Sequence, residues 1–175
     1  MRFYFRKILT VYFFNLFCYN CFVKPVNSGG VQMADKVFGE KKDVQYTDRV
    51  GAYLLCVKNG KLAVIKTGKG YFLPGGGIEG NETHQECIIR ECLEETGMST
   101  DVGEYICSAE SFLYHEKIGY FHPIQYYYAG EFPEKVSEPS ETDHKLVWID
   151  AELAKEKMKV EQQRWAVKKY LTGLN

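Results

Sequence analysis

The sequence has almost no net charge, and this limits the kind of ligand that the protein can bind. Its 175 residues carry a formal charge of −1, which provides no overall field to hold a nucleic acid polymer. A small molecule is therefore the expected ligand. Internal repeats and low-complexity tracts are also absent. A chain of this length is long enough for one domain with a real core and too short for two.

Cysteine is present, but it lacks the spacing of a disulfide framework or a zinc site. Cys56 lies in an apolar run, and Cys87 and Cys92 lie among residues that favour a helix. This placement favours buried free thiols in a reducing compartment over disulfides. Cys18 and Cys21 have neither a second pair nor a histidine at zinc spacing, so they indicate no metal or redox site. We therefore expect a cytoplasmic protein.

A hydrophobic run of membrane-spanning length is missing as well. Basic residues within 2–7 precede an apolar run over 8–23, which is shorter than the roughly 20 residues of a transmembrane helix but follows the order of a signal peptide. Met33 opens an ordinary polar sequence, and Gly29-Gly30 are what a translated ribosome-binding site would give. We expect residues 1–32 to be a mis-annotated start. The alternative is a genuine signal or anchor, and only then would a membrane be a partner.

From Met33 onward the pattern predicts strands on both sides of a central helix. A polar, mobile lead-in is expected over 34–48, and Asn59-Gly60 is a strong hairpin signal. The predicted strands are 50–57, 62–65, 71–73, two within 101–132, and 146–149. This order predicts an α/β fold, an α/β/α sandwich around a mixed β-sheet.

Two helical regions have recognisable ends. Thr83 and Glu86 form a capping box at the start of the central helix, and Gly97 stands where a left-handed C-terminal cap is wanted. Asp150 can cap a final helical region that reaches Leu171. The expected buried positions of that region are Leu153, Trp165, Val167 and Leu171.

The central helix carries three carboxylates on one face. Glu91, Glu94 and Glu95 are spaced i, i+3, i+4, which places them within an arc of roughly 100°. Such a cluster is unfavourable alone and becomes favourable around a divalent cation, although a solvated Glu-rich face is the ordinary alternative. Oxygen ligands without His or Cys favour Mg²⁺, or Mn²⁺, over zinc. The cation can neutralise phosphate charge and activate a water.

The surrounding residues carry a more specific pattern. The segment from Gly76 to Met98 matches G-x5-E-x7-R-E-U-x-E-E-x-G-U, where U is apolar, with Cys92 at a position that is usually aliphatic. This segment resembles the signature of the Nudix hydrolase family, and the likeness over about 45–173 is to the MutT-like bacterial branch. The resemblance implies a Nudix fold and a Mg²⁺-dependent enzyme, a pyrophosphohydrolase that cleaves a nucleoside diphosphate linked to a group X.

The resemblance also implies roles for individual residues. Glu91, Glu94 and Glu95 would be metal ligands, and one of them would orient or deprotonate the attacking water. Arg90 would orient a glutamate, and the carbonyl of Gly75 would be a further ligand.

A later acidic loop can also reach the metal in MutT-like enzymes. Glu141 is our candidate, with Asp143 and Glu138 as alternatives and a plain solvated loop as the ordinary interpretation. Within the signature itself, Glu82 would have a supporting role.

We expect a nucleoside triphosphate, such as the oxidised 8-oxo-dGTP, with Lys66 and Lys69 as candidates to neutralise its phosphates. Tyr114 resembles a marker of dinucleoside polyphosphate hydrolases, which are the alternative. A non-catalytic Nudix ligand sensor is a second alternative, although it would typically lack box glutamates. A prenyl diphosphate isomerase would need a catalytic cysteine that we cannot place.

Overall fold

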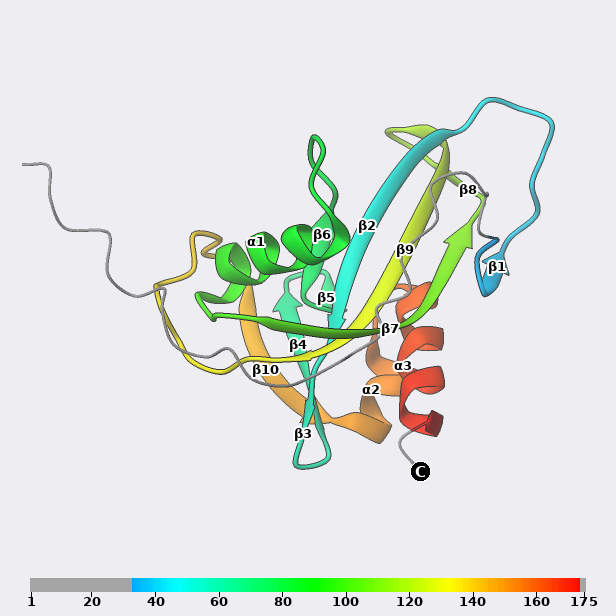
Figure 1. Cartoon of the computed structure of the whole chain (residues 1–175). Helices are drawn as coiled ribbons and strands as arrows, with labels where there is room; N and C mark the ends of the chain where they lie inside the picture. The colour runs from blue at the N-terminus through cyan, green and yellow to red at the C-terminus, as the bar shows by residue number, and fades with distance from the viewer. Residues whose placement is uncertain (1–32, 174–175) are drawn as a thin grey trace, which may run out of the picture. The chain divides into compact units, whose positions relative to one another are not determined.

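The computed structural model describes residues 33–173. The prediction that residues 1–32 are a mis-annotated start or a signal-like segment lies outside this range. Within it, two β-sheets and three helices form the predicted α/β/α arrangement (Figure 1). None of the helices in the described range combines the length and the apolar composition needed to cross a bilayer.

The larger sheet is mixed, as predicted. In spatial order its strands are β1 (Lys36–Phe38), β7 (Asp101–Ser111), β9 (Gly119–Glu131), β2 (Thr47–Leu55) and β6 (Gly75–Gly77), with β8 (Leu113–His115) paired to β9. Strand β9 runs parallel to β2 and antiparallel to β7. The parallel pairing of β2 with β9 brings residues far apart in the sequence side by side.

The smaller sheet is antiparallel. It contains β10 (Lys145–Asp150), β4 (Lys61–Thr67) and β3 (Val57–Lys58), with β5 (Gly70–Phe72) also paired to β4. The predicted hairpin joins β3 to β4, and both Asn59 and Gly60 have positive φ values of 52° and 73°. These are the left-handed conformations that a two-residue hairpin turn requires.

The central helix α1 (His84–Thr96) has the predicted ends. The Thr83 side chain accepts a hydrogen bond from the backbone N–H of Glu86, whose carboxylate accepts from Thr83 in return. Gly97 adopts the left-handed conformation at φ 69°, and its N–H donates to the Leu93 carbonyl. Local sequence signals were therefore sufficient to define this helix.

The final helical region differs from the prediction because it consists of two helices. These are α2 (Ala151–Lys157) and α3 (Glu161–Gly173), separated by extended backbone at Met158. Leu153 was wrongly predicted to be buried, since it is 49% exposed. Ala151 and Ala154 form the buried face of α2, and helical spacing turns Leu153 away from that face.

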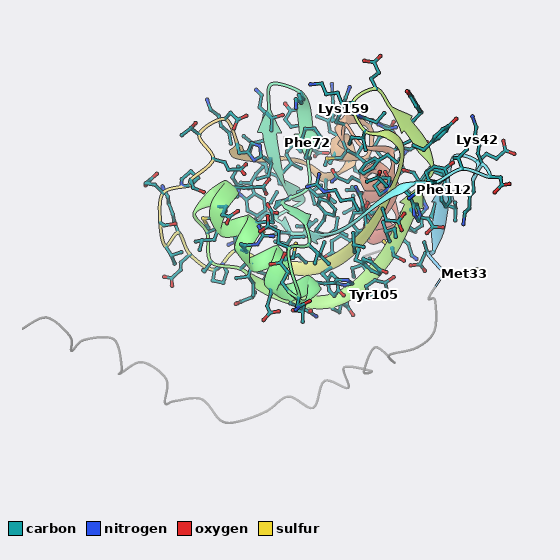
Figure 2. All side chains as sticks on the ribbon, turned by 90° about the horizontal axis from the view of Figure 1, so that it is seen from above. Met33, Lys42, Phe72, Tyr105, Phe112 and Lys159 are labelled. Atoms are coloured by element: carbon teal, nitrogen blue, oxygen red, sulfur yellow. The ribbon has the colours of Figure 1, made fainter. Side chains whose placement is uncertain are left out.

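Alternate residues of the central strands face opposite helical layers. On β2, Leu54 packs in a core that includes Ile88 of α1, whereas Leu55 packs in a second core with Val167 of α3. The space between the helices and the sheets is filled with side chains (Figure 2). The predicted buried thiols are confirmed for four free cysteines: Cys56, Cys87, Cys92 and Cys107.

The expected mobile lead-in over 34–48 contains an ordered strand. Strand β1 pairs in parallel with β7. The Asp35 carboxylate just before it accepts hydrogen bonds from the Ser108 N–H at 2.8 Å and from the Tyr105 hydroxyl at 3.0 Å. These contacts are with residues about 70 positions away, so the local sequence carried no signal for them.

Candidate active site

The glycine strand β6 brings backbone close to the carboxylates of α1. A Cβ atom at Gly76 would collide with the Glu91 carboxylate, so only glycine lets that carboxylate pack against the strand. Gly75 has a φ of 122°, and its N–H donates a hydrogen bond to Glu95 Oε2 at 3.0 Å. The run of glycines therefore positions both glutamates.

Arg90 connects the helix to the loop before it. Its Nε and Nη2 atoms donate to the two oxygens of Glu82 at 3.0 and 2.7 Å, a two-pronged pairing. Nη1 donates to Glu91 Oε1 at 3.1 Å, and Nη2 also donates to the Gly77 carbonyl at 3.1 Å. The hydrogen bonds from Arg90 lower the pKa of Glu82 to about 2. Arg90 thus holds Glu91 in one orientation.

The loop before β10 brings a third carboxylate to the site. The Glu94 carbonyl on α1 accepts hydrogen bonds from the backbone N–H groups of Ser140 and Glu141 at 2.9 and 3.2 Å. This contact places His144 Nδ1 3.1 Å from Glu95 Oε1 and 2.6 Å from Glu141 Oε2. Burial raises the pKa of Glu95 to about 8.

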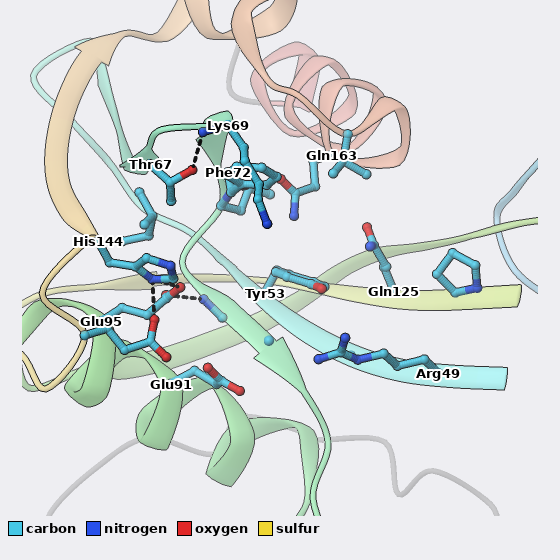
Figure 3. Close-up of a pocket in the computed structure, with 18 of the residues that line it drawn as sticks. Arg49, Tyr53, Thr67, Lys69, Phe72, Glu91, Glu95, Gln125, His144 and Gln163 are labelled. Carbon is cyan, nitrogen blue, oxygen red and sulfur yellow. Dashed lines mark hydrogen bonds and ion pairs between the residues drawn. The ribbon is translucent and has the colours of Figure 1, made fainter. Parts of the chain in front are cut away.

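A pocket of about 600 Å³ opens beside these residues (Figure 3). Glu91, Glu95 and Glu141 lie on one side of it, which we call the acidic end. The rest of the lining includes Arg49, Thr67, Lys69, Phe72, Phe121, Pro123, Gln125, Asp143, His144 and Gln163. The volume is within the range of small-molecule sites.

Several residues that the sequence pointed to meet at this pocket. Gly75, Glu91, Glu95, Glu141 and Lys69 all line it.

Glu94 lies at the edge of this arrangement. Its side chain is 42% exposed, and its Oε2 is 3.4 Å from Arg90 Nη1. Glu138, an alternative to Glu141, is exposed and pairs with Lys135 instead.

The structure does not bring Lys66 or Tyr114 to the pocket. Ile65 and Thr67 line it from β4, and the two-residue period of a strand directs Lys66 to the opposite face. Tyr114 is 67% exposed on β8 and packs edge-on against Tyr120, with ring centres 5.4 Å apart. Neither residue has a contact with the lining that would support its expected role.

Sequence reasoning missed much of the lining, including the four polar residues Arg49, His144, Gln125 and Gln163. The Arg49 side chain forms no hydrogen bond or ion pair with the residues in 33–173, and it lies over Gly77 at the pocket wall. His144 had a weak signal, since it follows Glu141 by three residues in an acidic loop. Gln125 and Gln163 had no signal, because a glutamine in a strand or helix is unremarkable until the fold shows what it faces.

The donor chemistry of the acidic end fits a divalent cation. The ligand atoms of Glu95, Glu141 and His144 all lie within 4.8 Å of one another. Carboxylate oxygens suit Mg²⁺ or Mn²⁺, whereas the imidazole of His144, which the sequence argument against zinc did not anticipate, is a ligand type that also suits Zn²⁺. Burial of the carboxyl groups of Glu91 and Glu95 raises their pKa values, which is the effect that a bound cation would offset.

Comparison with known proteins agrees with this arrangement. The family model of the NUDIX domain matches residues 45–170. No curated protein matches the chain.

Solved structures share the fold at low sequence identity. A MutT protein from Methanosarcina mazei Go1 has a TM-score of 0.60 at 17% identity, covering 75% of this chain and 99% of that chain. A NUDIX hydrolase from Nitrosomonas europaea has a TM-score of 0.58 at 16% identity, with coverage of 73% and 90%. A MutT NUDIX hydrolase from Burkholderia pseudomallei has a TM-score of 0.55 at 20% identity, with coverage of 70% and 98%. With the family model spanning most of the chain and the signature complete from Gly76 to Met98, this chain belongs to the Nudix hydrolase family.

Proposed function

We propose that this chain is a Mg²⁺-dependent pyrophosphohydrolase that cleaves a nucleoside diphosphate linked to a group X. The observation that carries the proposal is the acidic end, where carboxylates from α1 and from the loop before β10 meet at one side of a pocket. Mg²⁺, with Mn²⁺ as a substitute, would neutralise phosphate charge there and lower the pKa of a bound water. The catalytic domain in this proposal spans residues 45–173, and the free thiols favour a cytoplasmic location.

Different residues of the chain orient the metal-binding carboxylates and bind the substrate. Arg90 and the Gly75 N–H hold the carboxylates of Glu91 and Glu95 toward the pocket. Glu94 completes the ligand set expected from the signature. Arg49, whose guanidinium has no hydrogen-bond or ion-pair partner in the described range, and Lys69 both line the pocket and would bind substrate phosphates there.

For the substrate we favour a nucleoside triphosphate of the 8-oxo-dGTP kind. Lys69 and Arg49 support a polyphosphate, and the aromatic lining supports a base. A dinucleoside polyphosphate is less well supported, because its marker residue Tyr114 does not line the pocket. A non-catalytic sensor is less well supported as well, since Arg90 and all the signature glutamates are present.

A panel of nucleoside diphosphate derivatives tests the proposal. The full-length protein with Mg²⁺ should release a phosphate-containing product from at least one of them. Glu94→Gln should reduce turnover by about 10³-fold through the loss of one carboxylate, while the fold is retained. Glu138→Gln, which changes an exposed carboxylate outside the pocket, is the matched control and should be fully active. Normal turnover by Glu94→Gln would disprove the role given to Glu94.

A further inference from the structure

Two buried glutamines line the side of the pocket away from Glu91 and Glu95 (Figure 3). Gln125 lies on β9 and is 7% exposed, and Gln163 lies on α3 and is 2% exposed. A buried carboxamide has both an acceptor oxygen and a donor nitrogen to satisfy. How each amide is held therefore determines what it presents to a ligand.

The orientation of Gln163 is set by a backbone donor. The N–H of Leu73 donates to Gln163 Oε1 at 3.0 Å. A backbone N–H can only donate, so the oxygen must occupy this position and the amide nitrogen must point elsewhere. Within residues 33–173 this nitrogen has no hydrogen-bond partner, and Figure 3 shows the side chain directed into the pocket.

The hydroxyl of Tyr127 orients the Gln125 amide in the same way. Tyr127 is fully buried, and its hydroxyl donates to Gln125 Oε1 at 2.6 Å. Among residues 33–173, Gln125 Oε1 is the atom that accepts the hydrogen bond of the Tyr127 hydroxyl. The reverse orientation of the amide would leave a buried O–H without an acceptor. The amide nitrogen of Gln125 is thus also left free, on the pocket side.

These two nitrogens face open space and not packed protein. Among residues 33–173, the fully enclosed side-chain polar atoms without a partner are Thr100 Oγ1 and Ser111 Oγ, and neither glutamine is among them. The pocket wall therefore offers two carboxamide N–H₂ groups whose acceptors must come from water or from a ligand.

The remaining lining on this side indicates what carries those acceptors. Phe72, Phe121 and Pro123 add apolar surface to the lining, and Pro123 precedes Gln125 by two residues on β9, whereas phosphates belong near the acidic end. A planar base would stack on the apolar surface and direct its edge toward the amides.

We propose that Gln125 and Gln163 select a nucleobase whose edge presents carbonyl oxygens over one that presents exocyclic amino groups. The identity of the ligand as a nucleotide rests on the proposed function. An amino group opposite an amide N–H₂ would set two donors against each other, and an unmet buried donor lowers affinity by about 10-fold or more.

Binding of nucleoside monophosphates tests the selection without any turnover, because these compounds contain no diphosphate linkage. IMP and AMP differ by an oxo and an amino group on a purine, and UMP and CMP differ in the same way on a pyrimidine. Calorimetric titration of the full-length protein with Mg²⁺ should show that IMP binds about 10-fold tighter than AMP, and UMP tighter than CMP by a similar factor. Equal affinities, or a preference for the amino partner, would overturn the proposal.

Substitutions then locate the selection. Gln125→Glu and Gln163→Glu each retain the oxygen that Tyr127 or Leu73 needs and replace the free nitrogen by an oxygen, so each should abolish or reverse the preference. Gln125→Met removes the donor without adding charge and should reduce the ratio toward one. Thr67→Glu adds a negative charge to the same pocket and should weaken all four ligands equally, with unchanged ratios. Glutamate and methionine variants that fold, as shown by thermal unfolding, and keep the wild-type ratios would also overturn the proposal.

Different results would contradict the proposed hydrolysis and the proposed base selection. Selective binding of IMP and UMP, combined with no hydrolysis of any diphosphate derivative, would support the role of the glutamines and contradict the proposed hydrolysis. Hydrolysis of a diphosphate derivative without selective binding would support the proposed hydrolysis and contradict the role of the glutamines.

Discussion

At the scale of single residues, the acidic end is defined by how its side chains are held and charged. Glu95 is buried and accepts a hydrogen bond from the Gly75 N–H, and burial raises its pKa to about 8 from the ordinary value of 4.5. The metal-free protein therefore retains a proton on this carboxyl at neutral pH. Binding of a cation would displace that proton.

Glu95 should make the metal-free protein less stable as the pH rises. Between about pH 4.5 and pH 8 the unfolded chain has released the proton and the folded chain still holds it, so the free energy of unfolding falls with rising pH. Over this interval the fall is expected to be on the order of 4 kcal/mol. Urea unfolding of the wild type and of Glu95→Gln in EDTA measures it. The free energy of unfolding of the variant should lack this fall with rising pH. The same dependence on pH in both proteins would contradict the raised pKa of Glu95.

Arg49 should contribute to substrate binding, although its sequence context gave no sign of this. Arg49→Met removes an unpaired guanidinium from the pocket wall and should raise KM by about 10-fold or more. Lys66→Met is the matched control, since Lys66 lies on the face of β4 opposite the pocket-lining residues, and its kinetics should be unchanged. A larger effect for Lys66→Met than for Arg49→Met would reverse our assignment of the two cations.

At the scale of elements, the C-terminal end of α1 connects the helix to the loop that carries Glu141. The Gly97 carbonyl accepts hydrogen bonds from the Val136 and Ser137 N–H groups at 2.8 and 3.1 Å. The Glu94 carbonyl accepts two more from residues 140 and 141. Helix and loop therefore form one support for the acidic end.

Substitution of Gly97 should disturb this support. Gly97→Ala places a Cβ in a left-handed conformation and against the Ser137 carbonyl, so we expect a loss of stability of at least about 2 kcal/mol. Gly60→Ala is the matched control. Gly60 has a similar φ of 73° but no atom within 4 Å of the added Cβ, and its loss should be about 1 kcal/mol. Thermal or urea unfolding compares the two variants, and equal losses would show that the loop contact is unimportant.

At the scale of the whole molecule, the pocket joins elements from both sheets and from two helical layers. Its lining comes from β2, β4, β5, β6, β9, α1 and α3 and from connecting loops that include the one before β10. A ligand at the acidic end binds this assembled arrangement and not the unfolded chain. Binding is therefore coupled to global stability.

Mg²⁺ should consequently stabilise the folded protein. At a concentration ten times its dissociation constant, the expected gain is about 1.4 kcal/mol, or roughly 3–6 °C in Tm for a domain of this size. The comparison is with NaCl at the same ionic strength, because salt alone screens repulsion among the carboxylates. An equal shift with NaCl would mean that no specific site binds the cation.

The sequence by itself determined what is local along the chain. The capping box at Thr83, the left-handed Gly97 and the spacing of Glu91, Glu94 and Glu95 depend on residues within a few positions of one another, so α1 and its carboxylates could be predicted. The hairpin turn at Asn59-Gly60 is local in the same sense.

Only the tertiary structure decided which distant residues share the pocket. Strand β2 pairs in parallel with β9, so that Gly51 lies opposite Gln125, and Gln163 arrives on the last helix. The alternation of β4 turns Lys66 away while the following turn brings Lys69 in. Such placements depend on pairing register and on packing between layers, which no short stretch of sequence encodes.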